Sequence, residues 1–215
     1  MKIQIISTPR SGSAYLRSML DSYFNNNENY FSLSEPFNSG KFNNSQIYEN
    51  YLKIINSDVT VIKTHIHELV EFKKTNEDSY YSYLGHGWYN IILKRKDTFE
   101  ATLSRVISEK TGNWDNPEIE HPPIYIEIDY FFMKLKENIF WNRLLEENVL
   151  KLNYDTVIYY EDLSFIPKND ISMFNFKVTG ESTYTRKKMP DKTQRVSNYE
   201  ELKSKTEDFL KTHDR

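Results

Sequence analysis

A chain of 215 residues is long enough for one sizeable hydrophobic core, and we expect a single domain over residues 1–215. Its formal net charge of −3 argues against a general nucleic-acid binder, because such proteins are usually strongly basic. The sequence contains no cysteine, which excludes disulfides and thiolate metal sites. No signal peptide precedes the first predicted strand and no apolar run reaches the roughly 20 residues of a membrane span, so we expect a cytoplasmic protein without a membrane span.

Short apolar runs alternate with helix-like stretches along the chain, a pattern typical of a parallel α/β sheet. Strands are predicted, in chain order, at residues 2–7, 30–33, 59–63, 89–93 and 156–160. Helices are predicted at residues 13–24, 45–55, 67–75, 98–109, 126–150 and 199–210, and residues 110–124 are predicted to form a long loop. The expected fold class is therefore α/β, with a doubly wound, mainly parallel sheet of four or five strands flanked by helices.

The first predicted strand leads into a short loop that opens into a helix, and this segment reads Pro9, Arg10, Ser11, Gly12, Ser13 and Ala14. Free backbone N–H groups and the positive end of the helix dipole converge on a loop of this kind, and both favour a bound anion. Arg10 adds a fixed positive charge, and Ser11 and Ser13 add hydroxyl donors. We interpret the loop as a phosphate site, with an ordinary strand-to-helix turn capped by serine as the alternative.

The loop differs from the common P-loop, G-x-x-x-x-G-K-[ST], because no lysine follows Gly12 and the basic residue precedes it as Arg10. This order resembles the 5′-phosphosulfate-binding loop of sulfotransferases that use 3′-phosphoadenosine 5′-phosphosulfate (PAPS), with sequences such as PKSGTTW or PRSGSTLL. The resemblance implies a P-loop-like sulfotransferase fold in which residues 9–14 bind the phosphosulfate.

A second segment, NIILKRKDTFEATLSRVIS at residues 90–108, resembles the part of these enzymes that binds the 3′-phosphate of PAPS. There an arginine at a strand end and a serine on the next helix grip one phosphate, and the counterparts here are Arg95 and Ser104. Their spacing of nine residues is closer to bacterial carbohydrate sulfotransferases than to cytosolic members. The alternative is a solvated strand end followed by a surface helix with Asp97 or Thr98 as its N-cap.

A third segment, VIKTHIHE at residues 61–68, resembles the KTH segment of cytosolic sulfotransferases. The resemblance implies that Lys63 steadies the transferring sulfuryl group and that His65 is the general base, a role that the ordinary histidine pKa near ~6.5 permits. A zinc site begun by His65, His67 and Glu68 is a competing interpretation, although no further ligand cluster stands out. A histidine simply packed at a strand end is the other alternative.

A fourth segment, SEPFN at residues 34–38, places Glu35 just after the second predicted strand. It resembles the FEP-like segments of glycan-modifying sulfotransferases, in some of which the acidic residue is the catalytic base. Glu35 and His65 are therefore both candidate bases, and we expect one to accept the proton and the other to position the acceptor. A surface carboxylate before a turn proline is the alternative for Glu35.

Two further segments support the same family. VIYYEDLS at residues 157–164 resembles the YEDL strand end of many sulfotransferases, where Glu161 or Asp162 would tie loops together. Residues 184–202 carry a basic run that resembles the C-terminal loop over the cofactor, and Lys188, Lys192 and Arg195 are expected to contact it. A generic charged surface loop is the alternative for this run.

Together the motifs imply a PAPS-dependent sulfotransferase, closer to bacterial and carbohydrate-modifying members. PAPS would be the co-substrate without any metal, and a carbohydrate or small molecule would accept the sulfuryl group on a hydroxyl or amine by in-line displacement. Arg10 and Lys63 would stabilise the charge that develops on the sulfuryl group and the leaving phosphate. A P-loop-like kinase acting on a small molecule, or a non-catalytic protein that binds PAPS or its product, are the alternatives.

Overall fold

The computed structural model describes residues 1–24, 26, 28–84, 87–112, 121–149, 154–165 and 191–213. The chain divides into two compact units, Met1–Lys96 with Trp141–Thr185, and Asp97–Phe140 with Arg186–Arg215. The long helix α6 (Ile128–Val149) contributes residues to both units. The expectation of one domain over the whole chain stays a prediction.

The first unit is built on a five-stranded sheet in which every neighbouring pair of strands is parallel. The strand order is β2-β3-β1-β4-β5, so the chain builds outward from a central β1 in both directions. The strands are β1 (Lys2–Ser7), β2 (Tyr30–Ser34), β3 (Val59–His65), β4 (Trp88–Lys94) and β5 (Thr156–Tyr159). The prediction of an α/β protein with a parallel sheet of four or five strands is therefore confirmed.

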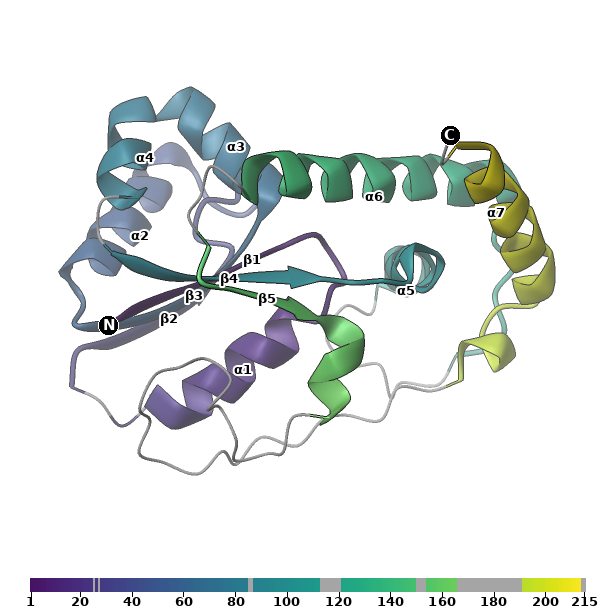
Figure 1. Ribbon diagram of the computed structural model, residues 1–215, viewed down its shortest axis with the longest axis horizontal. Helices are drawn as coiled ribbons and strands as arrows, with labels where there is room; N and C mark the ends of the chain where they lie inside the picture. Colours follow the sequence, from purple (N-terminus) through teal and green to yellow (C-terminus); the bar gives the residue numbers. More distant parts are fainter. Residues whose placement is uncertain are drawn as a thin grey trace. The chain divides into compact units, whose positions relative to one another are not determined.

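Helices cover both faces of this sheet (Figure 1). Ile3 and Ile5 of β1 belong to the core beneath one face, whereas Ile6 belongs to the core beneath the other, as the alternation of side chains along a strand requires. Leu16 and Leu20 of α1 pack on the first of these faces. The other face is covered by α2, α3 and α4. The helices are α1 (Ser13–Phe24), α2 (Asn44–Asn56), α3 (Ile66–Thr75) and α4 (Glu77–Leu84).

Several elements differ from the prediction: β3 runs to His65, α6 begins at Ile128 and α7 (Tyr199–His213) runs to His213, and further differences concern α4 and the helix predicted at residues 98–109. No helix is predicted from the sequence where α4 forms. The helix buries the rings of Tyr80 and Tyr83, three residues apart, in the core. Helix α5 (Thr98–Thr111) extends past its predicted end, so Lys110 belongs to the helix and not to the predicted loop. Gly112, with a left-handed φ of 67°, ends it, and residues 113–120 of that loop lie outside the described residues.

The second unit is helical over its described residues and has its own core. It comprises α5, the first part of α6, the 3₁₀ turn η3 (Lys192–Gln194) and α7 (Tyr199–His213). A parallel bridge joins Ile124 to Val196. Its buried side chains include Phe99, Leu103, Val106, Phe131, Leu135 and Leu202.

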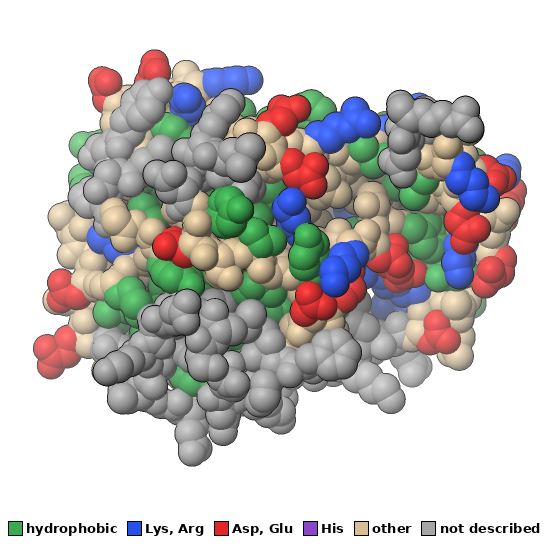
Figure 2. Space-filling view, in the orientation of Figure 1, with side chains coloured by type: hydrophobic (Ala, Val, Ile, Leu, Met, Phe, Trp, Pro, Cys, Tyr) green, Lys and Arg blue, Asp and Glu red, His purple; other side chains and the backbone are tan. Residues whose placement is uncertain are grey.

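Among the described residues, no helix has both the length and the apolar character needed to span a bilayer. On the face drawn in Figure 2, Lys and Arg side chains are interspersed with Asp and Glu side chains. Charges of both signs mixed in this way produce no strong local field of one sign.

A first prediction concerns the contact between Gly12 and Tyr160. Gly12 has a φ of +84°, and a Cβ placed on it would lie 2.3 Å from Tyr160 Cδ2. Gly12→Ala is therefore expected to lower the free energy of unfolding by about 2–4 kcal/mol, the sum of a left-handed backbone and an overlap with the ring. Urea denaturation measures this loss.

Gly112→Ala is the matched control, because Gly112 also has a positive φ but an added Cβ there lies within 4 Å of none of the residues that the structure describes. It should lose only the backbone contribution, about 1–2 kcal/mol. Equal losses in the two variants would contradict the close approach of Gly12 to the Tyr160 ring.

Candidate active site at the carboxyl edge of the sheet

Four of the sequence motifs lie at one edge of the first unit's sheet. Arg10 follows β1, Glu35 follows β2, His65 ends β3 and Arg95 follows β4, and these strands are parallel neighbours. The sheet register aligns the strand ends, since the end of β1 pairs with both His65 and the end of β4. In open parallel sheets ligands bind at the carboxyl edge, where the connections after adjacent strands leave in opposite directions. Here β1 and β4 are such a pair.

The loop after β1 has a tightly turned backbone. Arg10 and Gly12 both have a left-handed φ, 62° and 84°, and a non-glycine residue in this region is an uncommon conformation found mostly at functional sites. The hydroxyl of buried Ser11 donates to Thr8 O at 2.8 Å, and the amide of Leu16 donates to Gly12 O at 3.1 Å as α1 begins. At the base of the loop, Ser7 Oγ is buried without a hydrogen-bond partner. The loop therefore combines a helix N-terminus with a buried hydroxyl whose bonding capacity is not used.

Arg95 contacts this loop directly. Its Nη1 donates to Arg10 O at 3.1 Å, and its guanidinium lies 4.6 Å from the centroid of the Tyr160 ring. The same ring lies against Gly12. The structure thus brings together the loop and the arginine that the sequence assigns to two different phosphates of one cofactor.

Glu161 and Asp162, on the 3₁₀ turn η1 (Tyr160–Phe165), hold the segment that follows β4. Both carboxylate oxygens of Glu161 accept from the backbone amide of Lys96 at 3.2 Å, and Lys96 Nζ lies 3.3 Å from Asp162 Oδ1. Glu161 also lies 4.0 Å from Arg95 Nε. These contacts agree with the structural, loop-tying role expected for the YEDL segment.

Glu35 and Lys63 form a buried ion pair at the ends of β2 and β3. Lys63 Nζ donates to Glu35 Oε1, Lys41 Nζ donates to Glu35 Oε2, and Asn38 Nδ2 adds a bond of 3.2 Å. Burial raises the pKa of Glu35, but the charge of Lys63 and the hydrogen bonds from both lysines outweigh it and hold the pKa at about 2. Burial lowers the pKa of Lys63, and Glu35 opposes that change. Glu35 is therefore an ionised carboxylate already engaged by two cations.

His65 lies beside this pair, with one ring nitrogen directed to each of two carboxylates. Its Nε2 is 3.9 Å from Glu35 Oε1, and its Nδ1 is 3.7 Å from Glu68 Oε1. Burial, followed by the charge of Lys63, lowers the pKa of His65 well below its ordinary value of 6.5. The imidazole is therefore neutral near pH 7 and carries a lone pair.

Glu68, in the first turn of α3, is the site residue that the sequence analysis missed as part of the acid–base cluster. Its carboxylate is buried and accepts from Asn38 Nδ2 at 3.0 Å, from Thr64 Oγ1 at 3.1 Å and from the His65 amide at 3.1 Å. Burial raises its pKa to about 7, although the His65 amide opposes the shift. The spacing of Glu68 three residues after His65, typical of a helix-capping carboxylate, is the signal that would have found it. No comparable signal marks Lys41 or Asn38.

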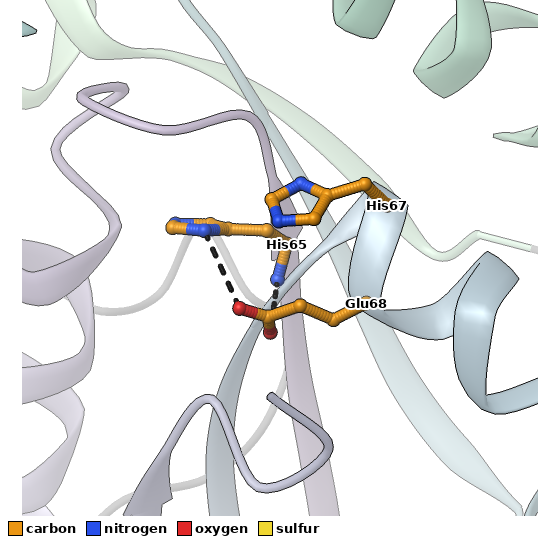
Figure 3. Close-up of side chains that lie close together, drawn as sticks. All are labelled: His65, His67 and Glu68. Atoms are coloured by element: carbon orange, nitrogen blue, oxygen red, sulfur yellow. Dashed lines mark hydrogen bonds and ion pairs between the residues drawn. The ribbon is translucent and has the colours of Figure 1, made fainter. Parts of the chain in front are cut away.

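Three side chains of this junction meet the requirements of a metal-binding cluster. His65, His67 and Glu68 each offer a ligand atom, and these atoms lie within 4.8 Å of one another (Figure 3). The ring of His67 stacks on Trp141 with centroids 5.1 Å apart.

The remaining predicted residues belong to the second unit. Ser104 is buried on α5. Lys192 Nζ donates to the backbone oxygen and the carboxylate of Glu100, at 2.8 and 2.6 Å, and Arg195 Nε donates to His121 Nε2 at 3.0 Å. Both basic residues therefore have partners within the protein, and Lys188 lies outside the described residues.

A second prediction follows from the buried carboxyl of Glu68. Its pKa is about 7 in the folded protein and near the ordinary 4.5 after unfolding, so the folded state binds more protons between these two values. The free energy of unfolding should therefore decrease as the pH rises from about 4.5 to about 7, by about 3 kcal/mol in total, and then level off. Glu68→Gln should remove this decrease, as measured by chemical denaturation at a series of pH values.

Glu71→Gln is the control, because Glu71 is exposed on the same helix and accepts a hydrogen bond from Ser39 Oγ. This variant should keep the pH dependence of the natural sequence. An unchanged slope in Glu68→Gln would show that another group is responsible.

Comparisons of the chain with models of protein families, with curated proteins and with solved structures find no match. The sulfotransferase resemblance of the motifs, and the specific P-loop-like sulfotransferase fold, therefore stay predictions. The carboxyl edge combines a loop that Arg95 contacts at a helix N-terminus with a cluster of two carboxylates, the buried Lys63, the exposed Lys41 and a neutral histidine.

Proposed function

We propose that this chain is a sulfotransferase that moves a sulfuryl group from PAPS to a hydroxyl or amine of a carbohydrate or small-molecule acceptor. The observation that carries the proposal is the contact of Arg95 with the Arg10 loop, at the sheet edge that also holds Lys63 and His65. A cofactor with phosphates at both ends of a ribose needs two cationic groups close together, next to the reacting atoms. The P-loop-like sulfotransferase fold belongs to the same proposal and is supported by the loop opening from the central strand.

In this proposal the 5′-phosphosulfate occupies the loop at residues 9–14. The N-terminus of α1 supplies backbone N–H donors and the positive end of the helix dipole, and Arg10 supplies a guanidinium that stays protonated. The unused hydroxyl of Ser7 supports an oxyanion at the base of the loop. These donors would stabilise the charge that the leaving phosphate gains during transfer.

Arg95 takes the 3′-phosphate in this proposal. Its guanidinium has five N–H donors, and its bond to Arg10 O uses one of them. The ring of Tyr160 and the carboxylate of Glu161 fix the guanidinium in place, which favours a preformed site. The assignment of Ser104 to the same phosphate rests on the sequence alone.

His65 is the proton acceptor that the geometry favours. Its imidazole is neutral near pH 7, whereas both oxygens of Glu35 already accept bonds from lysines and its pKa of about 2 makes it a weak base. Glu35 instead keeps Lys63 charged and in place, and Lys63 would steady the sulfuryl group as it moves in line from phosphate to acceptor. Proton transfer from the acceptor to His65 Nε2 completes the step, and no metal takes part in it.

A third prediction tests the 3′-phosphate site with 3′-phosphoadenosine 5′-phosphate (PAP), the product of PAPS, and with AMP, which lacks the 3′-phosphate. PAP should bind more tightly than AMP. Arg95→Gln should weaken PAP roughly 10- to 100-fold, the value of one or two charged hydrogen bonds, and leave AMP almost unchanged. Isothermal titration calorimetry measures both affinities.

Lys96→Gln is the matched control, since Lys96 is adjacent and exposed and pairs with Asp162. It should bind both nucleotides as the natural sequence does. A parallel loss of PAP and AMP in Arg95→Gln would mean that Arg95 only holds the loop, and equal weak binding of PAP and AMP to the natural sequence would contradict the whole proposal.

A fourth prediction tests the base, with an acceptor found by transfer of radioactive sulfate from labelled PAPS. His65→Gln should lower kcat by about 10²- to 10⁴-fold, the usual contribution of a general base. Because the pKa of His65 is well below 6.5, the rate of the natural enzyme should stay flat through neutral pH and fall only in acid. Glu35→Gln should be slower but should keep that acid limb.

His213→Gln serves as the control, because His213 is the last residue of α7 in the second unit and has no role in the proposal. Near-full activity of His65→Gln together with an inactive Glu35→Gln would transfer the role of base to Glu35. Near-full activity of both variants would rule out this catalytic scheme.

A further inference from the structure

We propose that His65, His67 and Glu68 form a Zn²⁺ site, and that bound zinc inhibits the protein by occupying its proton acceptor. The binding part of this inference is independent of the proposed function. The inhibitory part rests on the role proposed there for His65.

The three side chains have the chemistry and the placement of a zinc-binding set. Two imidazoles and one carboxylate, leaving one position open, are a set found in zinc sites of proteins. His65 ends β3, and His67 and Glu68 lie in the first turn of α3, so a single strand-to-helix junction carries all three. Figure 3 shows their side chains reaching to the same side of this junction.

The distances require only a small contraction. The ligand atoms lie within 4.8 Å of one another, and His65 Nδ1 is 3.7 Å from Glu68 Oε1. Zinc bonds of 2.0–2.2 Å in a tetrahedral arrangement bring ligand atoms to about 3.4 Å from one another. The His65–Glu68 pair is therefore already close to the separation that zinc requires, and the remaining contraction is at most about 1.4 Å between any two ligand atoms.

Groups around the cluster already hold the ligands in position, as the outer shell of a metal site does. Asn38, Thr64 and the His65 amide donate to Glu68 and fix the plane of its carboxylate. A carboxylate accepts about four hydrogen bonds, so these three leave capacity for a metal. On the other side, the Trp141 ring stacks on His67 and fixes the plane of that imidazole.

Among the contacts of the described residues that hold it, the Glu68 carboxylate makes no ion pair with a lysine. The groups that donate to the buried Glu68 carboxylate are neutral, whereas the charge of neighbouring Lys63 is matched by Glu35 in its own ion pair. A buried carboxylate is costly unless a cation or several hydrogen bonds compensate it. Zinc bound to Glu68 would place a positive charge directly on this carboxylate, whose present hydrogen-bond donors are all neutral.

Zinc bound at His65 Nδ1 prevents the proposed proton transfer. An imidazole that binds a metal through one nitrogen keeps a proton on the other, so His65 Nε2 would become an N–H donor. It then has no lone pair for the proton of an acceptor. Zinc is accordingly expected to inhibit transfer, and a chelator to restore it.

The fifth prediction is that the full chain binds zinc in the absence of PAPS, after dialysis against a chelator has removed any metal. Calorimetry, and competition with a chromophoric zinc chelator, should give one Zn²⁺ per chain. His67→Gln should weaken the affinity at least about tenfold, since loss of an outer-shell group alone costs 10- to 100-fold. Glu68→Gln should do the same, and His121→Gln should bind zinc as tightly as the natural sequence.

His67→Gln is the decisive variant, because His67 is only partly buried and its replacement is tolerated more readily than that of buried Glu68. Absence of stoichiometric zinc binding, or equal affinity in His67→Gln and the natural sequence, would overturn the site. If zinc binds as expected but the rate of sulfuryl transfer is the same with and without zinc, the inhibitory role is overturned. A protein that binds zinc and has no transferase activity would overturn the proposed function and leave the site intact.

Discussion

The buried ion pair between Lys63 and Glu35 is the interaction on which the candidate site depends. Lys63 lies on a central strand with its ammonium group almost completely buried, and a charge in that position is stable only beside a carboxylate. Glu35 meets this requirement with a left-handed backbone, φ 58°, and its amide donates to Lys63 O at 2.6 Å. The turn that follows β2 is fixed by the same contact, and it brings in Lys41 and Asn38.

This pair also determines the chemistry of the neighbouring groups. Lys63 keeps Glu35 ionised and helps to keep His65 neutral, so two groups that look like equivalent bases in the sequence acquire different protonation behaviour. Asn38 then connects the pair to Glu68, because its side-chain amide donates to both carboxylates. Two carboxylates at one strand edge therefore have pKa values of about 2 and about 7, because lysines bond to one of them and burial dominates at the other.

The sequence predicts the elements of the sheet better than the contacts of the site. The α1 helix and β1 have their predicted limits, because apolar periodicity and the loop at Gly12 mark both ends clearly. Helix α4 is not predicted from the sequence. Burial of Tyr80 and Tyr83 against the rest of the core stabilises it, and this contribution cannot be read from the eight residues of the helix alone. Within the site, the positions of Arg10, Glu35, His65 and Arg95 at strand ends follow from a parallel sheet. The pairing of Lys63 with Glu35 and the burial of Glu68 depend on contacts between separate strands and turns, which no local pattern encodes.

The position of Tyr160 has a consequence for the order in which the first unit folds. The loop at Gly12 comes from the start of the chain, yet the ring that packs on it and on Arg95 follows β5, almost 150 residues later. Contacts of such sequence separation form late, because the intervening chain must first be closed into a loop. During synthesis from the N-terminus, β1, β3 and β4 are complete before Tyr160 is available. The nascent chain therefore possesses its central strands before the Tyr160 ring can pack on the loop at Gly12, and this loop gains its final contacts only when the last strand joins the sheet.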